Sequence, residues 1–288
     1  MIPRLALLSL LACSAHAQLA ETLVSNAWTD PFPPFRIVGN VYWVGTYDLS
    51  SYLIVTPEGD ILINTGLAGS VPQIRSNIEA LGFKVSDIKI LMATHAHWDH
   101  VAGMAEMKRI TGARLLATEA DAVLLEDGGQ SDFRWGGDPG AAFTPVKVDR
   151  KIKDGEKVRL GGMELTVHHH PGHTKGAASF SFNVRENGRD YRVLIANPGA
   201  INAGVVLLNN PKYPNIVQDY ARTFHDQKEL TTDIFLASHA GQFQMHDKYK
   251  PGDPYDPGRF VDPQGYRASV ERLERIYLDQ LDRERKSK

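Results

Sequence analysis

Hydrophobic residues in the first half of the chain alternate between short continuous runs and one helical stretch. Runs rich in β-branched and aromatic residues, bounded by Gly, Pro or Asp, predict strands at Val41–Val44, Ser51–Val55, Asp60–Ile63 and Ile88–Thr94. Hydrophobic residues spaced three and four apart predict a helix over Val71–Leu81, and Gly82 is a typical residue to end it. The first half therefore indicates strands that are followed or flanked by helices.

The second half shows the same alternation. Similar runs predict strands at Met163–Val167, Ala178–Val184, Arg192–Ala196 and Asp233–Ala237, with a helix at Val217–Glu229. A last helix begins at Asp262, which can act as its N-cap, with Pro263 in the first helical position. Its expected apolar stripe consists of Val270, Leu273, Ile276, Tyr277 and Leu281.

These elements predict one fold class. Consecutive strands with hairpin-like connections and helices at the outside indicate two β-sheets packed face to face, with helices on the outer faces. We therefore expect an α/β sandwich. The sequence shows no internal repeat, no Gly/Ser-rich or charged linker and no second long apolar stretch, so residues 18–288 are expected to form a single domain.

The first 17 residues have the pattern of an export signal. Arg4 precedes an apolar run, Leu5–Ala12, and Ala15-His16-Ala17 matches the small-x-small pattern of a secretory cleavage site. The run is much shorter than the roughly 20 residues that a membrane span needs. We expect a periplasmic or secreted protein; a lipid-anchored form acylated on Cys13 is the less favoured alternative.

Charge and cysteine content narrow the possible partners. The chain of 288 residues has 32 Lys and Arg against 34 Asp and Glu, with no basic block, which argues against nucleic acid as a partner. Cys13 is the only cysteine, so an internal disulfide and a cysteine metal site are both excluded. We expect a monomer without a transmembrane segment that acts on a small molecule.

Metal-binding residue types are concentrated in one short segment. His95, His97, Asp99 and His100 lie within six residues, directly after the predicted strand Ile88–Thr94. The ends of strands in α/β proteins are common ligand sites. In an extended segment His95 and His97 point to the same side, so both can reach one ion, while Asp99 and His100 can reach a second. Imidazoles with one carboxylate favour zinc.

Two other histidines occupy comparable places. His173 lies in Pro171-Gly172-His173-Thr174 after one predicted strand, and His239 lies in Ser238-His239-Ala240-Gly241 after another. Both can complete a metal site. The remaining mature histidines are expected to be surface residues or to have their hydrogen bonds satisfied by the fold: His168, His169, His170, His225 and His246.

The His-x-His-x-Asp-His motif, together with Pro-Gly-His-Thr and Ser-His-Ala-Gly, resembles the metallo-β-lactamase superfamily. Further segments resemble the third subclass of class B β-lactamases: Pro31–Ile37, Gly45-Thr46, Ser51–Ile54, Ile61–Thr65 and Phe260–Pro263. This resemblance covers nearly the whole mature chain. It implies the αβ/βα sandwich fold of that family.

The resemblance also implies a site and a reaction. The first of two zinc ions would be bound by His95, His97 and His173, and the second by Asp99, His100 and His239. A metal-bound hydroxide would hydrolyse the β-lactam amide bond without a covalent enzyme intermediate, which confers antibiotic resistance. Asp99 would also orient the nucleophilic water. From their positions at strand ends, three further residues could either support the ligands from behind or make ordinary loop hydrogen bonds: Asn64, Thr65 and Thr94.

The substrate side is less well defined by the sequence. Aromatic residues that could form an apolar rim over the metals, or simply pack the loops, are Trp28, Phe32, Phe35, Phe133 and Trp135. The subclass commonly holds the substrate carboxylate with serine after the strand that corresponds to Arg192–Ala196, and this chain has none there. Asn197 and Asn202 are the alternative donors, and we favour Asn202.

Other functions remain open from the sequence. A lactonase or a glyoxalase-type thioesterase shares the metal motif, but those enzymes usually carry a bridging aspartate where this chain has Ala196-Asn197-Pro198. A non-enzymatic zinc protein is a third interpretation. Its zinc would normally be closed by four ligands, whereas six ligands shared by two ions leave open positions.

Overall fold

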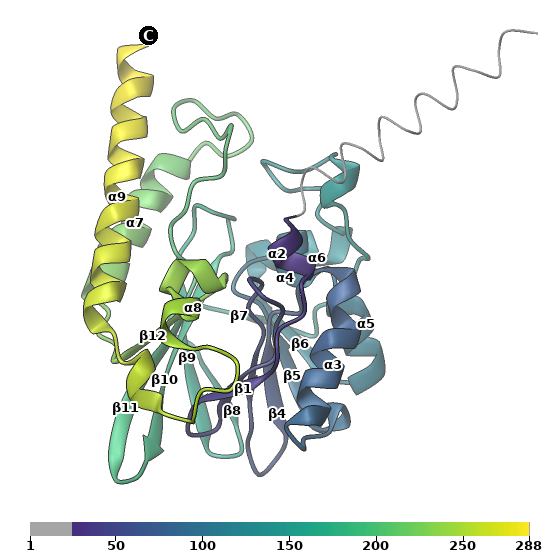
Figure 1. The fold of residues 1–288 in the computed structure, drawn as a ribbon. Coiled ribbons are helices and arrows are strands. Elements are labelled where there is room, and N and C mark those ends of the chain that lie inside the picture. The colour runs from purple at the N-terminus through teal and green to yellow at the C-terminus, as the bar shows by residue number, and fades with distance from the viewer. Residues whose placement is uncertain (1–24, 288) are drawn as a thin grey trace, which may run out of the picture.

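The computed structural model describes residues 25–287 and contains two β-sheets (Figure 1). The seven-stranded sheet runs in chain order: β1 Phe35–Val38, β2 Val41–Trp43, β3 Tyr52–Ile54, β4 Asp60–Ile63, β5 Ile88–Met92, β6 Arg114–Thr118 and β7 Arg150–Ile152. The five-stranded sheet has the order β12-β11-β10-β9-β8, with β8 Lys157–Leu160, β9 Met163–His169, β10 Ala178–Glu186, β11 Arg189–Ala196 and β12 Ile234–Ala237. Each sheet is mixed: β1 to β4 are antiparallel and β4 to β7 parallel, while only the β11–β12 pair is parallel in the second sheet.

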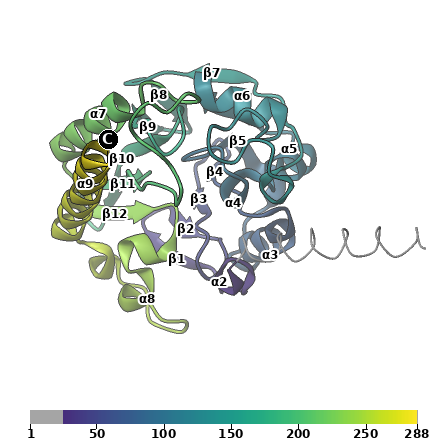
Figure 2. The same ribbon diagram turned by 90° about the horizontal axis from the view of Figure 1, so that it is seen from above.

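Helices cover the outer faces of both sheets. The longer ones are α3 Val71–Ala80, α5 Met104–Thr111, α6 Glu119–Asp127, α7 Ile216–Glu229 and α9 Pro263–Lys286, and the short ones are α2 Asn26–Thr29, α4 Trp98–Val101 and α8 Met245–Lys248. Figure 2 shows α7 and α9 outside one sheet, and α3, α5 and α6 outside the other. The predicted α/β sandwich is confirmed.

Strand alternation explains why both faces of the first sheet are buried. In β4, Ile61 and Ile63 belong to the core between the two sheets, whereas Leu62 faces the cluster formed with Ile74 and Ile78 of α3. Successive side chains of a strand point to opposite faces, so a strand covered on both sides has consecutive apolar residues, as β4 has at Ile61, Leu62 and Ile63. This is why β4 has no polar alternation in its sequence.

Helix α9 follows the expected pattern with one correction. The side chain of Asp262 accepts a hydrogen bond from the Gly265 N–H at 2.8 Å, and Pro263 begins the helix. Four of the five expected stripe residues are buried, but Ile276 is 43% exposed. Ile276 precedes the buried Tyr277, and neighbouring residues of a helix lie about 100° apart, so the two cannot share a narrow stripe.

The boundaries of β5 and β9 differ from the prediction in a way that matters for the site. Strand β5 ends at Met92 rather than Thr94, because the Thr94 N–H bonds to the side chain of Asn64 instead of a neighbouring strand. Strand β9 extends to His169, which pairs with Ala178 of β10. The histidine-rich loops that follow β5 and β9 therefore begin at the same edge of the sandwich.

The export signal at residues 1–17, including Cys13, lies outside the residues that the structure describes. Over residues 25–287, none of the helices combines the length and the apolar composition needed to cross a bilayer.

Candidate metal centre

The loop after β5 is held at both ends by residues that follow β4. Asn64 adopts a left-handed conformation, with φ of 65°, and its Oδ1 accepts a hydrogen bond from the Thr94 N–H at 2.9 Å. The next residue, Thr65, donates its N–H to the carbonyl of His100 at 2.8 Å. Asparagine tolerates this backbone region better than most residues. The segment from Thr94 to His100 is thus fixed where it leaves β5 and where it enters α4.

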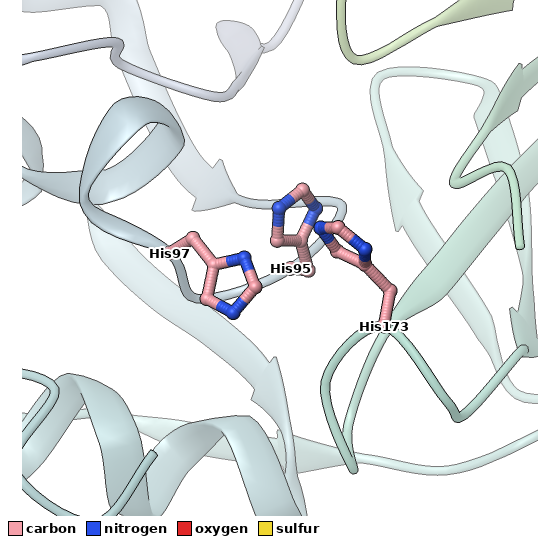
Figure 3. Close-up of side chains that lie close together, drawn as sticks. All are labelled: His95, His97 and His173. Carbon is pink, nitrogen blue, oxygen red and sulfur yellow. The ribbon is translucent and has the colours of Figure 1, made fainter. Parts of the chain in front are cut away.

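Three histidines converge from two loops. His95 and His97 come from the loop after β5, and His173 comes from the loop after β9 (Figure 3). One ring nitrogen of each lies within 4.8 Å of the others. The ring centroids are separated by 4.4 Å for His95 and His173 and by 4.7 Å for His97 and His173. This spacing allows the three rings to contact one central cation.

A second group adjoins the first. His95, Asp99 and His100 also offer ligand atoms within 4.8 Å of one another. Asp99 Oδ2 lies 3.1 Å from His100 Nε2 and 3.4 Å from His239 Nε2. His239, which comes from the loop after β12, therefore contacts the second group through Asp99. The two groups share His95, and His239, which belongs to neither group, lies beside the second one through its contact with Asp99, so all six sequence-predicted ligands lie in one region.

Burial controls the charge of these side chains in the protein without metal. Burial lowers the pKa of His173 to about 3 and also depresses the pKa of His95 and of His100. Burial opposes ionisation of Asp99, yet the neighbouring His100 and His239 hold its pKa well below the usual range. Neutral imidazoles beside an ionised carboxylate have lone pairs directed into the site, as a metal ion requires.

His239 behaves differently. Burial disfavours its charged form, but hydrogen bonds with Asp48 and Asp99 outweigh that effect and raise the pKa of His239 to about 9. His239 thus lies between two carboxylates, which favour the protonated form of its imidazole.

Buried imidazole nitrogens without hydrogen-bond partners indicate that this site can bind a cation. Within residues 25–287, His95 Nε2 and His100 Nδ1 are buried and make no hydrogen bond. An unsatisfied buried polar atom costs free energy, so native proteins rarely leave one. A cation among these rings would satisfy His95 Nε2. The donor set of imidazoles and one carboxylate therefore fits a zinc-type ion.

Groups behind the ligands fix which nitrogen faces the site. His173 Nδ1 donates to the carbonyl of Ala200 at 2.8 Å, and His239 Nδ1 donates to Asp48 Oδ2 at 2.8 Å, so each leaves Nε2 for a cation. The carboxylate of Asp132 lies 3.5 Å from His97 Nε2. Neither Asp48 nor Asp132 was identified from the sequence. No local motif marks them, because their partners are distant along the chain.

The expected aromatic rim is only partly supported. Phe32 and Phe133 are 4% and 7% exposed and belong to the core between the sheets, so the prediction that they line the substrate site is corrected to a packing role. Trp28 lies beside a candidate ligand, and Trp135 lies beside a neighbour of one. The Trp28 ring is 5.6 Å from the ring of His239, and Trp135 is 5.1 Å from Trp98, which neighbours His97.

The two asparagines after β11 have different environments. Asn197 is buried, its N–H donates to Ser179 Oγ at 2.9 Å, and its carbonyl accepts from Gln227. Asn202 is partly exposed, and its carbonyl accepts from the Val205 N–H at 3.1 Å. Only Asn202 is placed where solvent, and therefore a ligand from solvent, can reach it.

The histidines expected to be satisfied by the fold are so. His168 and His170 lie 2.7 Å from the hydroxyls of Ser181 and Ser179. The other three follow the same interpretation: His169 Nε2 is 2.9 Å from the carbonyl of Lys175, His246 Nε2 is 2.9 Å from that of Tyr47, and His225 is exposed.

The chain is similar to known proteins in both sequence and structure. The sequence profile of the metallo-beta-lactamase superfamily matches residues 45–186. Among solved structures, the class B3 di-zinc metallo-beta-lactamase LRA-12 from an Alaskan soil metagenome is 49% identical in sequence, with a TM-score of 0.87 over 89% of this chain and 97% of that chain. The metallo-beta-lactamase GOB-18 from Elizabethkingia meningoseptica is 47% identical, with a TM-score of 0.88 over 90% and 96% of the two chains.

Relatives in sequence among curated proteins are named hydroxyacylglutathione hydrolases and not β-lactamases. A hydroxyacylglutathione hydrolase from Rhodopseudomonas palustris is 27% identical over 189 residues, which is 66% of this chain. The matching region spans 61% of that protein. The sequence identity with the two solved structures is higher than with this hydrolase, and the match covers a larger share of both chains.

Proposed function

Because this chain belongs to the metallo-β-lactamase superfamily, we propose that it is a zinc-dependent hydrolase of the β-lactam amide bond. The observation that carries the proposal is the convergence of His95, His97 and His173 within 4.8 Å, beside a second group that includes Asp99. The overall identity of 49% with a class B3 enzyme, over nearly its whole length, supports the same substrate class.

The six converging side chains would hold two zinc ions. His95, His97 and His173 would bind the first ion, and Asp99, His100 and His239 the second. When bound, the ions would make water nucleophilic near neutral pH and stabilise negative charge on the departing nitrogen. Two hydrogen bonds hold the rings of His173 and His239 in orientation for metal binding. The Ala200 carbonyl accepts from His173 Nδ1, and the Asp48 carboxylate accepts from His239 Nδ1.

Asp99 has two proposed roles. Its carboxylate lies between His100 and His239, so one oxygen can ligate the second ion. The other oxygen is then available to accept a hydrogen bond from the attacking water and orient it toward the substrate carbonyl. Trp28 and Trp135 would contact the apolar parts of the substrate, and Asn202 would donate to its carboxylate.

A thioesterase of the glyoxalase type is the second candidate, because the curated sequence matches have that activity in their name. Against it, this chain has Ala196-Asn197-Pro198 where such enzymes usually have a bridging aspartate. None of these three side chains can supply a negatively charged ligand to two cations. Absence of that carboxylate, together with the higher identity to β-lactamases, favours β-lactam hydrolysis.

The proposed place of action is outside the cytoplasm. Residues 1–17 have the composition of an export signal. A periplasmic or secreted monomer would meet small-molecule antibiotics before they reach their targets.

The function is tested with purified mature protein, a penicillin, a cephalosporin and a carbapenem. We expect hydrolysis of at least one, complete loss after a strong chelator, and recovery on addition of zinc. Metal analysis should give two zinc ions per chain. Hydrolysis that survives chelation and complete metal removal would contradict the proposal, as would a chain that holds no zinc in excess metal.

Asn202→Ala is expected to raise KM about tenfold with little change in kcat. A neutral donor contributes roughly 0.5–1.5 kcal/mol, and about twice that toward a carboxylate, so the loss affects binding rather than the zinc chemistry. Steady-state kinetics measure both constants. Asn215→Ala, a change at an exposed position before α7 whose side chain makes no capping hydrogen bond, is the control. An unchanged KM for Asn202→Ala would place carboxylate binding elsewhere.

Asp48→Asn is expected to weaken the second zinc by about 10–100-fold, because the carboxylate orients His239 and makes it a stronger ligand. Competition with a chromophoric chelator measures the affinity of each site. The first zinc should be retained. Asp247→Asn, which changes an exposed carboxylate of α8, is the matched control. Equal affinities in Asp48→Asn and the wild type would show that His239 needs no such partner.

A further inference from the structure

Asp121 is a buried carboxylate that the proposed reaction does not use. It lies in the first turn of α6, three residues after Thr118, the N-cap. Acidic side chains at this position usually remain near solvent and interact with the exposed N–H groups of their own helix. Asp121 is instead 4% exposed, and its hydrogen-bond partners belong to other segments. Burial of a carboxylate requires such partners.

The partners of Asp121 come from both loops that bear the first group of histidines. Oδ2 accepts a hydrogen bond from the Ala96 N–H at 2.8 Å, and Ala96 lies between His95 and His97. The same oxygen accepts from the hydroxyl of Thr174 at 3.1 Å, directly after His173. Oδ1 accepts from the Gly176 N–H at 3.1 Å. One carboxylate therefore joins the loop after β5 to the loop after β9.

Close packing reinforces this junction. A Cβ at Gly176 would lie 2.3 Å from Thr118 Oγ1 and 2.6 Å from Asp121 Oδ1, so only glycine allows the loop to approach the start of α6 so closely. Thr118 Oγ1 also donates to the carbonyl of Gly176 at 2.6 Å. Two residues at the beginning of α6, Thr118 and Asp121, thus form hydrogen bonds with Gly176 in the loop that carries His173.

We propose that Asp121 is a positioning residue for the first zinc, and that it sets the distance between the His95–His97 loop and the His173 loop before the ion binds. The inference rests on the proposed zinc site. Ligands on two separate loops lose conformational freedom when an ion joins them, and a site whose loops are already joined avoids that loss. The negative charge of Asp121 also lies close to the loop that carries the cation's ligands.

The test compares Asp121→Asn with Glu119→Gln. Asparagine keeps the size of the side chain but has one acceptor oxygen in place of two, so at least one of the three hydrogen bonds must be lost or reversed. Glu119→Gln neutralises a carboxylate two residues away on the same helix, where it is exposed and forms an ion pair with Lys151 at 3.5 Å. Both variants lose one negative charge from the start of α6.

Three readouts separate positioning from general stability. Chelator competition gives the affinity of the first zinc, melting of metal-free and zinc-loaded protein gives the zinc-induced rise in Tm, and the visible spectrum of the cobalt-substituted protein reports ligand geometry. For Asp121→Asn we expect about tenfold or weaker zinc binding, a smaller rise in Tm and an altered cobalt spectrum. Glu119→Gln should match the wild type in all three.

Wild-type affinity and spectrum in Asp121→Asn would overturn the inference, even if the metal-free Tm falls, because a purely structural role lowers both melting temperatures equally. If Asp121→Asn does not fold, Thr174→Val decides, since it removes only the hydroxyl that joins His173's loop to Asp121. We expect several-fold weaker zinc binding, and unchanged binding would overturn the inference. A wild type that binds no zinc contradicts the proposed function itself, whatever the variants do.

Discussion

His97→Ala is expected to lower kcat/KM for a β-lactam by about 10²–10⁴-fold, the range lost when an activated nucleophile is removed. His97 belongs to the group of three whose nitrogens lie within 4.8 Å, and no other histidine or carboxylate of the described residues completes that group in its place. The first zinc should be lost or bound weakly. Steady-state kinetics and metal analysis of the same preparation measure the two effects.

His239→Ala should behave differently from His97→Ala. His239 contacts the site only through Asp99 and His100, so its loss should weaken the second zinc and leave the first in place. Excess zinc should restore part of the activity of His239→Ala but not of His97→Ala. Both variants should fold, and His225→Ala, at an exposed position of α7, is the control. Equal effects of the two substitutions would contradict the assignment of the histidines to separate ions.

Asp99→Asn is expected to lower kcat by about 10²–10⁴-fold, with a smaller change in KM. An amide is a weaker metal ligand than a carboxylate and cannot accept hydrogen bonds at both of its terminal atoms. The first zinc, whose proposed ligands are all histidines, should remain.

The measurement for Asp99→Asn combines kinetics with site-resolved zinc affinity. Asp279→Asn, which changes an exposed carboxylate of α9, is the control. If Asp99→Asn keeps wild-type kcat with both zinc ions bound, Asp99 does not orient the nucleophile, and another group must.

The fold and the six candidate ligands could be predicted because their signals are local. Apolar runs such as Asp60–Ile63 and the spacing of His95, His97, Asp99 and His100 are visible within a few residues. Strand ends of α/β sheets gather at common edges, so ligands that follow different strands can be expected to meet.

Other features depend on contacts between distant segments and gave no local signal. Asp48 is 191 residues from His239 in sequence. Asp121 lies on α6 and forms hydrogen bonds with the loop after β5 and with the loop after β9. Strands β1, β6, β7 and β8 were not predicted, and β7 and β8 are short with several polar residues. Such elements are defined by their pairing in the sheet more than by their own sequence.

Aromatic residues were the least predictable part of the site. Phe32 and Trp28 are both near the mature N-terminus, yet Phe32 packs against Phe35 and Tyr249 in the core, whereas Trp28 lies over His239. Composition indicates only that such residues seek apolar surroundings. Whether those surroundings are the core or the wall of a site is decided by tertiary packing.

The central claim is that the zinc site hydrolyses β-lactams and not glutathione thioesters. It is tested most directly by measuring kcat/KM for a penicillin, a carbapenem and a glutathione thioester with one preparation of zinc-loaded mature protein. We expect efficient, chelator-sensitive turnover of at least one β-lactam, with kcat/KM at least about 10²-fold above that for the thioester, since a site complementary to one transition state stabilises the other less well. Efficient hydrolysis of the thioester, with no turnover of any β-lactam, would contradict the account.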